Sequence, residues 1–107
     1  MSYRVVIAAD ARQDMSVLYG YIATHDSIAN ADLILSALQE ACGTLREQPT
    51  RGKIPAEMQL LGVTAYREIR FKAYRIVYRI EERTVVIYGV ADGRRDMQSF
   101  LHRRLVR

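Results

Sequence analysis

The stretch YREIRFKAYRIVYRI, residues 66–80, alternates apolar and polar side chains with the period of two that is typical of β-strands. It belongs to a longer run that predicts three strands, over about 65–72, 74–82 and 84–91. The turn between the last two strands is built around Glu82-Arg83. The third strand, TVVIYGV, is apolar on both faces, so we expect it to be a central strand that is covered on both sides.

The polar positions of residues 66–80 carry an unusual share of positive charge. Glu68 is the one acid in the stretch, and its cations are Arg67, Arg70, Lys72, Arg75 and Arg79. Because adjacent antiparallel strands share faces, the alternation places four of these cations on one face: Arg70, Lys72, Arg75 and Arg79. The opposite face takes the apolar residues, which are Ile69, Phe71, Tyr74, Ile76, Tyr78 and Ile80.

This basic face admits two interpretations. If helices cover only the apolar face, the four cations form an open surface, and clustered like charges cost stability unless an anionic partner is bound. The planar fork of arginine suits phosphate or carboxylate partners. Alternatively, the face is a solvated strand surface on which Glu68 and Glu81 pair with some of the cations.

The N-terminal half predicts two helices. The first has an apolar stripe on one face, made of Ala11, Met15, Leu18, Tyr19 and Ile22. The second has a seam with a spacing of three and four residues: Ile28, Ala31, Leu35, Leu38, Cys42 and Leu45. We expect Asp10 to cap the first helix, Asp26 or Ser27 to cap the second, and Pro49 to end it. The short loop between them predicts an antiparallel hairpin.

The remaining elements complete a single α+β domain over residues 1–107. Residues 3–8 predict a short strand, and residues 49–64 predict an irregular segment punctuated by proline and glycine. A last helix is indicated by the spacing of Met97, Phe100, Leu101 and Leu105. The expected order is β-α-α-β-β-β-α, with the N-terminal helical hairpin packed on one face of a mainly antiparallel sheet.

Composition narrows the class of function. Residues 1–48 carry three cations and six acids, whereas residues 49–107 carry thirteen cations and six acids, which favours an anionic partner for the second half. No metal-ligand or glycine-rich phosphate motif occurs, so we expect neither a metal nor a cofactor. The single cysteine, Cys42, excludes an internal disulfide, and no apolar run is long enough for a membrane span. The cytoplasm is the expected compartment.

Three segments resemble the RelE/ParE toxin superfamily. The pattern of its first helix is matched by Asp10-Ala11, Asp14-Met15 and Tyr21-Ile22-Ala23. The Leu-x-x-x-Pro-x-x-Gly pattern that ends its second helix is matched by Leu45, Pro49 and Gly52. Residues 66–96 resemble its sheet and closing Gly-Arg-Arg-Asp, with five matching positions: Arg67, Arg75, Tyr78, Arg95 and Asp96.

The resemblance implies the toxin of a type II toxin–antitoxin pair, blocked by a cognate antitoxin. ParE-like members inhibit DNA gyrase, whereas RelE-like members cut mRNA on the ribosome with basic residues and, in some, a tyrosine in the last helix. The long hairpin favours the ParE-like branch, as does the presence of Phe100 and Leu101 where that tyrosine is expected. Many ParE-like chains have histidine at the place of Asp92, however, so the RelE-like alternative stays open, as do an unassigned target and an inactive relative.

The predicted target-binding residues are Arg70, Lys72, Arg75, Arg79, Arg94 and Arg95. No catalytic residue is assigned for a gyrase inhibitor; for a ribonuclease the set is Arg70, Lys72, Arg75 and Arg95. A pairing of Arg95 with Asp96 that only fixes the junction is the alternative for that residue. The tail HRRLVR, residues 102–107, either contacts an acidic partner or completes a basic last turn that suits the helix dipole. The hairpin should also leave a groove for an amphipathic antitoxin segment, with Val17 and Leu33 as candidate contacts.

Overall fold

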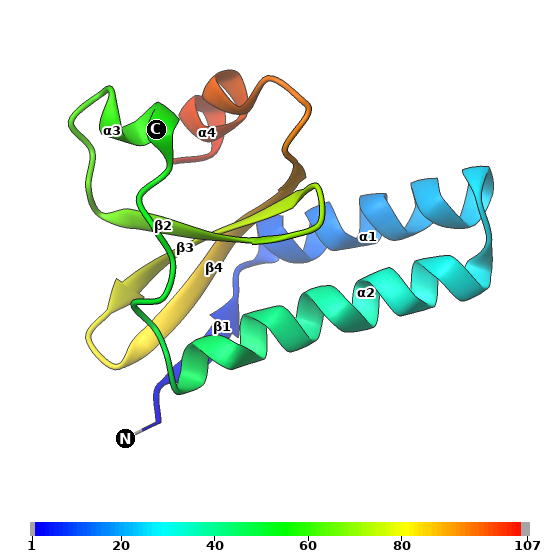
Figure 1. Ribbon diagram of the computed structural model, residues 1–107, viewed down its shortest axis with the longest axis horizontal. Coiled ribbons are helices and arrows are strands. Elements are labelled where there is room, and N and C mark those ends of the chain that lie inside the picture. The colour runs from blue at the N-terminus through cyan, green and yellow to red at the C-terminus, as the bar shows by residue number, and fades with distance from the viewer. Residues whose placement is uncertain (1, 106–107) are drawn as a thin grey trace.

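The computed structural model describes residues 2–105 and has the predicted order of main elements (Figure 1). Met1, Val106 and Arg107 lie outside the described residues. The elements are β1 (Arg4–Ile7), α1 (Ala9–His25), α2 (Ile28–Gly43), η1 (Thr44–Arg46), α3 (Ala56–Gln59), β2 (Tyr66–Phe71), β3 (Tyr74–Glu81), β4 (Thr84–Asp92) and α4 (Met97–Leu105). Two short elements were not predicted, the 3₁₀ turn η1 and the four-residue helix α3. The helix α3 lies in the segment that was expected to be irregular.

The four strands form one mixed sheet in the order β1-β4-β3-β2. β1 pairs with β4 in parallel, and the two other pairings are antiparallel. The expectation that β4 is a central strand is therefore confirmed. The register of β3 against β4 shifts once: Val77 lies opposite Gly89 and Tyr78 opposite Ile87, so Tyr88 is an inserted residue that makes a β-bulge in β4.

The helical hairpin packs on one face of the sheet, as the sequence predicts. Its buried residues join the apolar face of the strands in one core: Ala11, Met15, Ile22, Ala31, Ile34, Leu38, Cys42, Leu45, Ile69, Ile76, Tyr78, Val85, Ile87 and Val90. Ile28 was expected in this core but is 65% exposed, whereas Ile34, which was not part of the predicted seam, is buried. Burial raises the pKa of the Cys42 thiol to about 11, which keeps it in its unreactive neutral form.

The ends of the two hairpin helices differ from each other in how they are capped. The Ser27 hydroxyl accepts a hydrogen bond from the Asn30 amide at 3.0 Å, which confirms Ser27 as the cap of α2. The expected cap of α1 is wrong, because α1 begins one residue before Asp10 and its cap position is Ala8. Asp10 instead lies in the first turn, where its charge favours the positive end of the helix dipole.

The opposite face of the sheet is also covered, by α3 and α4 (Figure 1). A second core forms there from Met58, Val77, Ala91, Met97, Phe100 and Leu101. The expectation of a wholly uncovered basic face is therefore wrong. The sheet is instead the middle layer between the hairpin and two short helices, because the outward positions of β3 and β4 include Val77 and Ala91, which need apolar cover.

Residues 49–53 are held against the sheet by Tyr78 and Arg67. The buried Tyr78 hydroxyl donates to the Pro49 carbonyl at 2.7 Å and accepts from the Gly52 amide at 3.0 Å. Arg67 donates from Nη1 to the Gly52 carbonyl at 2.8 Å. A side chain at Gly52 would place Cβ 2.5 Å from that hydroxyl and 2.6 Å from the Glu68 carbonyl oxygen. The spacing of Pro49 and Gly52 is thus explained by one buried tyrosine.

Candidate target-binding surface

Arg75 does not belong to an open surface. It is 4% exposed, although it was predicted to stand on the basic face. Its Nε donates to Glu68 at 2.6 Å, and its two Nη atoms bind the Glu57 carboxylate of α3 at 2.8 and 2.7 Å. These hydrogen bonds lower the pKa of Glu57 to about 2. Arg75 therefore attaches α3 to the sheet, and the Glu57 carboxylate that it binds is ionised at neutral pH.

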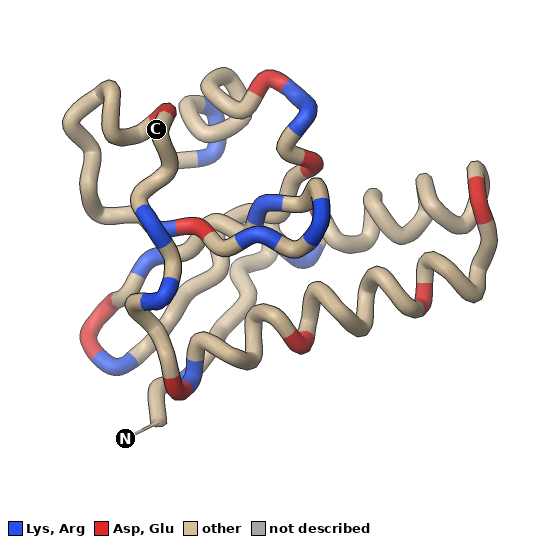
Figure 2. The backbone as a smooth tube through the Cα atoms, viewed as in Figure 1, with Lys and Arg blue, Asp and Glu red and all other residues tan. Residues whose placement is uncertain are grey.

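Four of the predicted cations are exposed at one end of the sheet, and we call this cluster the basic end: Arg70, Lys72, Arg94 and Arg95. The β2–β3 turn meets the β4–α4 junction there, because the Gly93 amide donates to the Ala73 carbonyl at 2.7 Å. Lys72 lies in that turn with a φ of 53°, one residue beyond β2, so it does not share the strand pattern expected of it. Figure 2 shows the basic residues of the turn and of the junction at the same end of the sheet, with the helical hairpin extending beyond them.

The cations of the basic end differ in how they are held. The Arg94 guanidinium donates from Nε to Asp92 at 2.9 Å, and this contact lowers the pKa of the Asp92 carboxyl. The Arg95 guanidinium lies 4.6 Å from the centre of the Phe100 ring. Asp96 caps α4 instead of pairing with Arg95. The Asp96 carboxylate accepts from the Ser99 amide at 3.1 Å and from the Ser99 hydroxyl at 2.7 Å.

Arg79 lies apart from the basic end. It pairs across the ladder with Tyr66, whereas Arg70 pairs with Arg75, so Arg79 and Arg70 are separated by roughly 13 Å along β2. Its guanidinium lies 5.8 Å from the centre of the Tyr66 ring. The six predicted target-binding residues thus divide into four that gather, one that is buried and one at the far end of the strands.

Sequence reasoning missed the pair that docks α4, Asp14 and Arg104. Arg104 binds Asp14 through both Nη atoms, at 2.7 and 3.0 Å, and donates to the Tyr88 carbonyl at 3.0 Å. Asp14 also accepts from the Val90 amide at 2.9 Å. The Tyr88 carbonyl and the Val90 amide lie at the β-bulge, which the sequence did not predict. A cleft of about 280 Å³ lies beside this pair, lined by Asp10, Asp14, Arg95, Phe100, Arg103 and Arg104.

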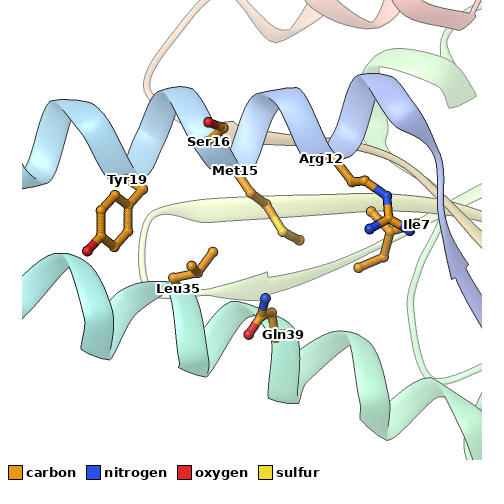
Figure 3. Close-up of a pocket in the computed structure, with 7 residues that line it drawn as sticks. All are labelled: Ile7, Arg12, Met15, Ser16, Tyr19, Leu35 and Gln39. Carbon is orange, nitrogen blue, oxygen red and sulfur yellow. The ribbon is translucent and has the colours of Figure 1, made fainter.

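A groove lies between the two helices of the hairpin, beside β1 (Figure 3). It has a volume of about 410 Å³ and is lined by Ile7, Arg12, Met15, Ser16, Tyr19, Leu35 and Gln39. Tyr19 is oriented at its edge by a hydrogen bond of 2.7 Å from its hydroxyl to Asp32, which raises the pKa of the tyrosine. Val17 and Leu33, the predicted contacts, are exposed but do not line this groove.

Groups suited to acid–base or metal chemistry are sparse in the described chain. Among residues 2–105, no three His, Cys, Asp or Glu side chains gather as metal ligands would. The positions where a tyrosine is expected in α4 hold Phe100 and Leu101, and both are buried. His25 stacks on Tyr21 at the hairpin tip with ring centres 4.1 Å apart, while His102 is exposed on α4. No helix within residues 2–105 has the length and apolar character to cross a bilayer.

The sequence of residues 5–97 matches the family described as ParE toxin of type II toxin-antitoxin system, parDE. The chain belongs to the ParE toxin family. A comparison with curated protein sequences found no match. Family membership agrees with the resemblance seen in the sequence and makes the chain a toxin of the type II toxin–antitoxin class.

Solved structures of toxin–antitoxin proteins are similar to this ParE-family chain. The chromosomal ParDE system from P. aeruginosa superposes with a TM-score of 0.73 at 14% identity, over 85% of this chain and 96% of that one. The RelBE2 complex from Mycobacterium tuberculosis gives 0.64 at 28% identity, over 86% and 99%. A doubly substituted RelE of E. coli in the free state gives 0.61 at 14% identity, over 94% and 93%. These complexes support a cognate antitoxin as a partner.

Proposed function

We propose that this ParE-family toxin acts on DNA gyrase, by binding it and inhibiting it, and that a cognate antitoxin neutralises it in the cytoplasm. The observation that carries the proposal is the state of Arg75. A phosphate-cleaving sheet face needs cations free to reach the substrate, and Arg75, at the centre of that set, is held by Glu57 and Glu68. Inhibition by binding requires no such chemistry.

The basic end provides a surface for this interaction. Its four cations are exposed: Arg70, Lys72, Arg94 and Arg95. Clustered positive charges favour association with an acidic protein surface. Arg94 is held by Asp92 at 2.9 Å, whereas Arg70 makes a longer contact of 3.4 Å with Glu68, so Arg70 and Lys72 are the better sites for testing the charge.

A supercoiling assay with purified gyrase tests the proposed function. The toxin should block supercoiling. The Arg70→Ala, Lys72→Ala double variant should need about a tenfold higher concentration for the same inhibition, because removing charges from an interface weakens binding. Arg4→Ala, an exposed cation on β1, is the matched control and should act like the wild type. Gyrase that stays fully active at saturating toxin would contradict the proposal.

Ribosome-dependent mRNA cleavage is the second candidate, and the similarity to RelE folds favours it. Under that alternative, Arg70, Lys72 and Arg95 would contact RNA while Arg75 had to be released from Glu57. Induction in bacteria separates the two functions. Filamentation with a DNA-damage response supports gyrase inhibition, whereas rapid translation arrest with cleaved mRNA supports the nuclease.

The hairpin groove is the proposed site for the antitoxin. Its lining is mostly apolar with polar residues at the rim, which suits one face of an amphipathic helix (Figure 3). Ser16→Arg would fill the groove and should weaken antitoxin binding about tenfold or more, with toxicity kept. Ser36→Arg, on α2 outside the groove, is the matched control. Equal antitoxin affinity of the two variants, measured by calorimetry, would place the antitoxin elsewhere.

A further inference from the structure

Two leucines next to each other protrude from the turn that follows α3. Leu60 is 85% exposed and Leu61 is 51% exposed, although both belong to the large apolar type that is usually buried. Neighbouring residues of the same turn, Met58 and Val63, pack into the second core. A core is therefore available next to this turn, and the two leucines lie outside it.

The backbone of the turn that carries these leucines is fixed by hydrogen bonds. The Gly62 amide donates to the Gln59 carbonyl and the Val63 amide to the Met58 carbonyl, both at 3.0 Å. This pair of bonds, with Gly62 at a φ of 72°, is the Schellman arrangement that ends helices. A backbone that is already fixed loses little conformational entropy when the turn is bound, so the leucines are well placed to contact a partner.

The leucines border a basic surface on α4. A cleft of about 370 Å³ lies between Leu61 and the outer face of that helix, and it is lined by Leu61, Gln98, Ser99, His102 and Arg103. Arg103 also lines the neighbouring cleft of about 280 Å³, where Arg95 lies. The two clefts and the leucines form one strip, and we call it the leucine–α4 strip.

We propose that the leucine–α4 strip is the contact surface for an acidic segment of the toxin's target protein, which places an apolar side chain in the 370 Å³ cleft. Arg103 lines both clefts and Arg95 lines one of them, and these two arginines set the charge of the partner. The other two arginines of residues 93–105, Arg94 and Arg104, already bind Asp92 and Asp14. Aliphatic side chains offer no stacking surface to bases, whereas exposed apolar residues bordered by polar ones mark sites of protein interaction. The inference rests on the proposed function in that gyrase is the protein used as the probe.

The test replaces exposed residues, so folding should be unaffected. The Leu60→Ser, Leu61→Ser variant should need a concentration of toxin about tenfold higher to half-inhibit supercoiling, and should lose growth arrest on induction. Leu33→Ser is the matched control, since Leu33 is 69% exposed on α2. It should act like the wild type in both assays, and circular dichroism melting should show all three proteins folded.

A second pair of variants tests the charge of the partner. Gln98→Glu adds an acid to the cleft and should lower potency severalfold, whereas Gln98→Lys should keep or raise it. Equal potency of these two variants would overturn the acidic character of the partner.

The failure of the inference and of the proposed function give different results. If the double leucine variant still arrests growth like the wild type, the strip is not the target surface, whatever the target is. If that variant stays toxic but escapes the antitoxin, the strip binds antitoxin and the inference is again overturned. If gyrase is unaffected by the wild type while growth arrest depends on the leucines, the proposed function fails and the strip stands.

Discussion

Asp14 and Arg104 lie 90 positions apart in the chain and form a two-pronged ion pair that closes a ring of hydrogen bonds around the bulge of β4. The ring runs from the Val90 amide to Asp14, from Asp14 to Arg104, and from Arg104 to the Tyr88 carbonyl. It gives hydrogen-bond partners to two backbone groups of β4 at the bulge, and it joins α1, β4 and α4 at one point.

Replacing Asp14 should detach α4 selectively. Asp14→Ala leaves Arg104 without its main partner in a site where both side chains are largely buried, and should lower the free energy of unfolding by about 3 kcal/mol. Hydrogen exchange followed by mass spectrometry should show faster exchange in α4 while amides of α2 keep their protection.

Asp10 provides the control for this ion pair. It approaches Arg104 only to 3.8 Å and its side chain is 55% exposed, so Asp10→Ala should cost less than about 1 kcal/mol. Equal losses for the two variants would mean that general charge near Arg104, and not the ring at the bulge, docks α4.

Acid should release α3. The pKa of Glu57 falls from its usual value near 4.5 to about 2 because Arg75 donates two hydrogen bonds to it. A carboxyl whose folded-state pKa is depressed stabilises the fold fully above its unfolded value and loses that contribution as the pH falls from about 4.5 to 2. The lost stability should be about 2–3 kcal/mol, discounted for partial exposure.

Urea unfolding at pH 7 and pH 3 measures this effect. Glu57→Gln should be less stable than the wild type at pH 7, and the gap between the two proteins should narrow at pH 3. Comparing the two proteins cancels the titration of other carboxyls, including Asp92 and Asp96, whose pKa values are lowered by Arg94 and Ser99. A gap that does not change with pH would contradict an ionised Glu57–Arg75 contact.

Two glycines should respond oppositely to alanine. Gly52→Ala forces a Cβ against the Tyr78 hydroxyl and the Glu68 carbonyl, and should lower the free energy of unfolding by about 3 kcal/mol. Gly20 lies inside α1 with open space around it, so Gly20→Ala should raise stability by about 0.5–1 kcal/mol. Chemical denaturation of both variants checks the signs, and two losses would argue against open space at Gly20.

Tyr78→Phe should report on the turn over residues 49–53. Removing the hydroxyl leaves the Pro49 carbonyl and the Gly52 amide without their shared partner, which should cost about 1–3 kcal/mol. Tyr88→Phe is a fitting control, because the Tyr88 hydroxyl binds Glu81 at an exposed position. Thermal melts of the two variants should differ by several degrees.

Local patterns predicted the elements of this fold well. The alternation in β2 and β3 and the helical stripes of α1 and α2 depend on neighbours within a few residues, so they can be read from the sequence. The side of the sheet occupied by the hairpin followed from the apolar face of β3. What could not be read was α3, a helix of four residues whose existence depends on Met58 entering the second core.

The candidate site was only partly predictable for the same reason. Whether a strand arginine is open or buried depends on which carboxylate reaches it, and Glu57 lies 18 positions before Arg75. The alternation placed Arg75 on the correct face, and its burial followed from a contact that no local pattern encodes. Asp14 matched a family position in the sequence. Its partner Arg104 could not be predicted, because Arg104 binds at the bulge of β4 and the sequence did not predict that bulge.

The parallel pairing of β1 with β4 has a consequence for synthesis. Residues 4–7 leave the ribosome early, yet their ladder forms only when residues 84–87 have followed them out. Pairings of such large sequence separation form late, because a long loop must close first. The four-stranded sheet of this toxin therefore cannot be complete before residues 84–87 have been synthesised and have left the ribosome.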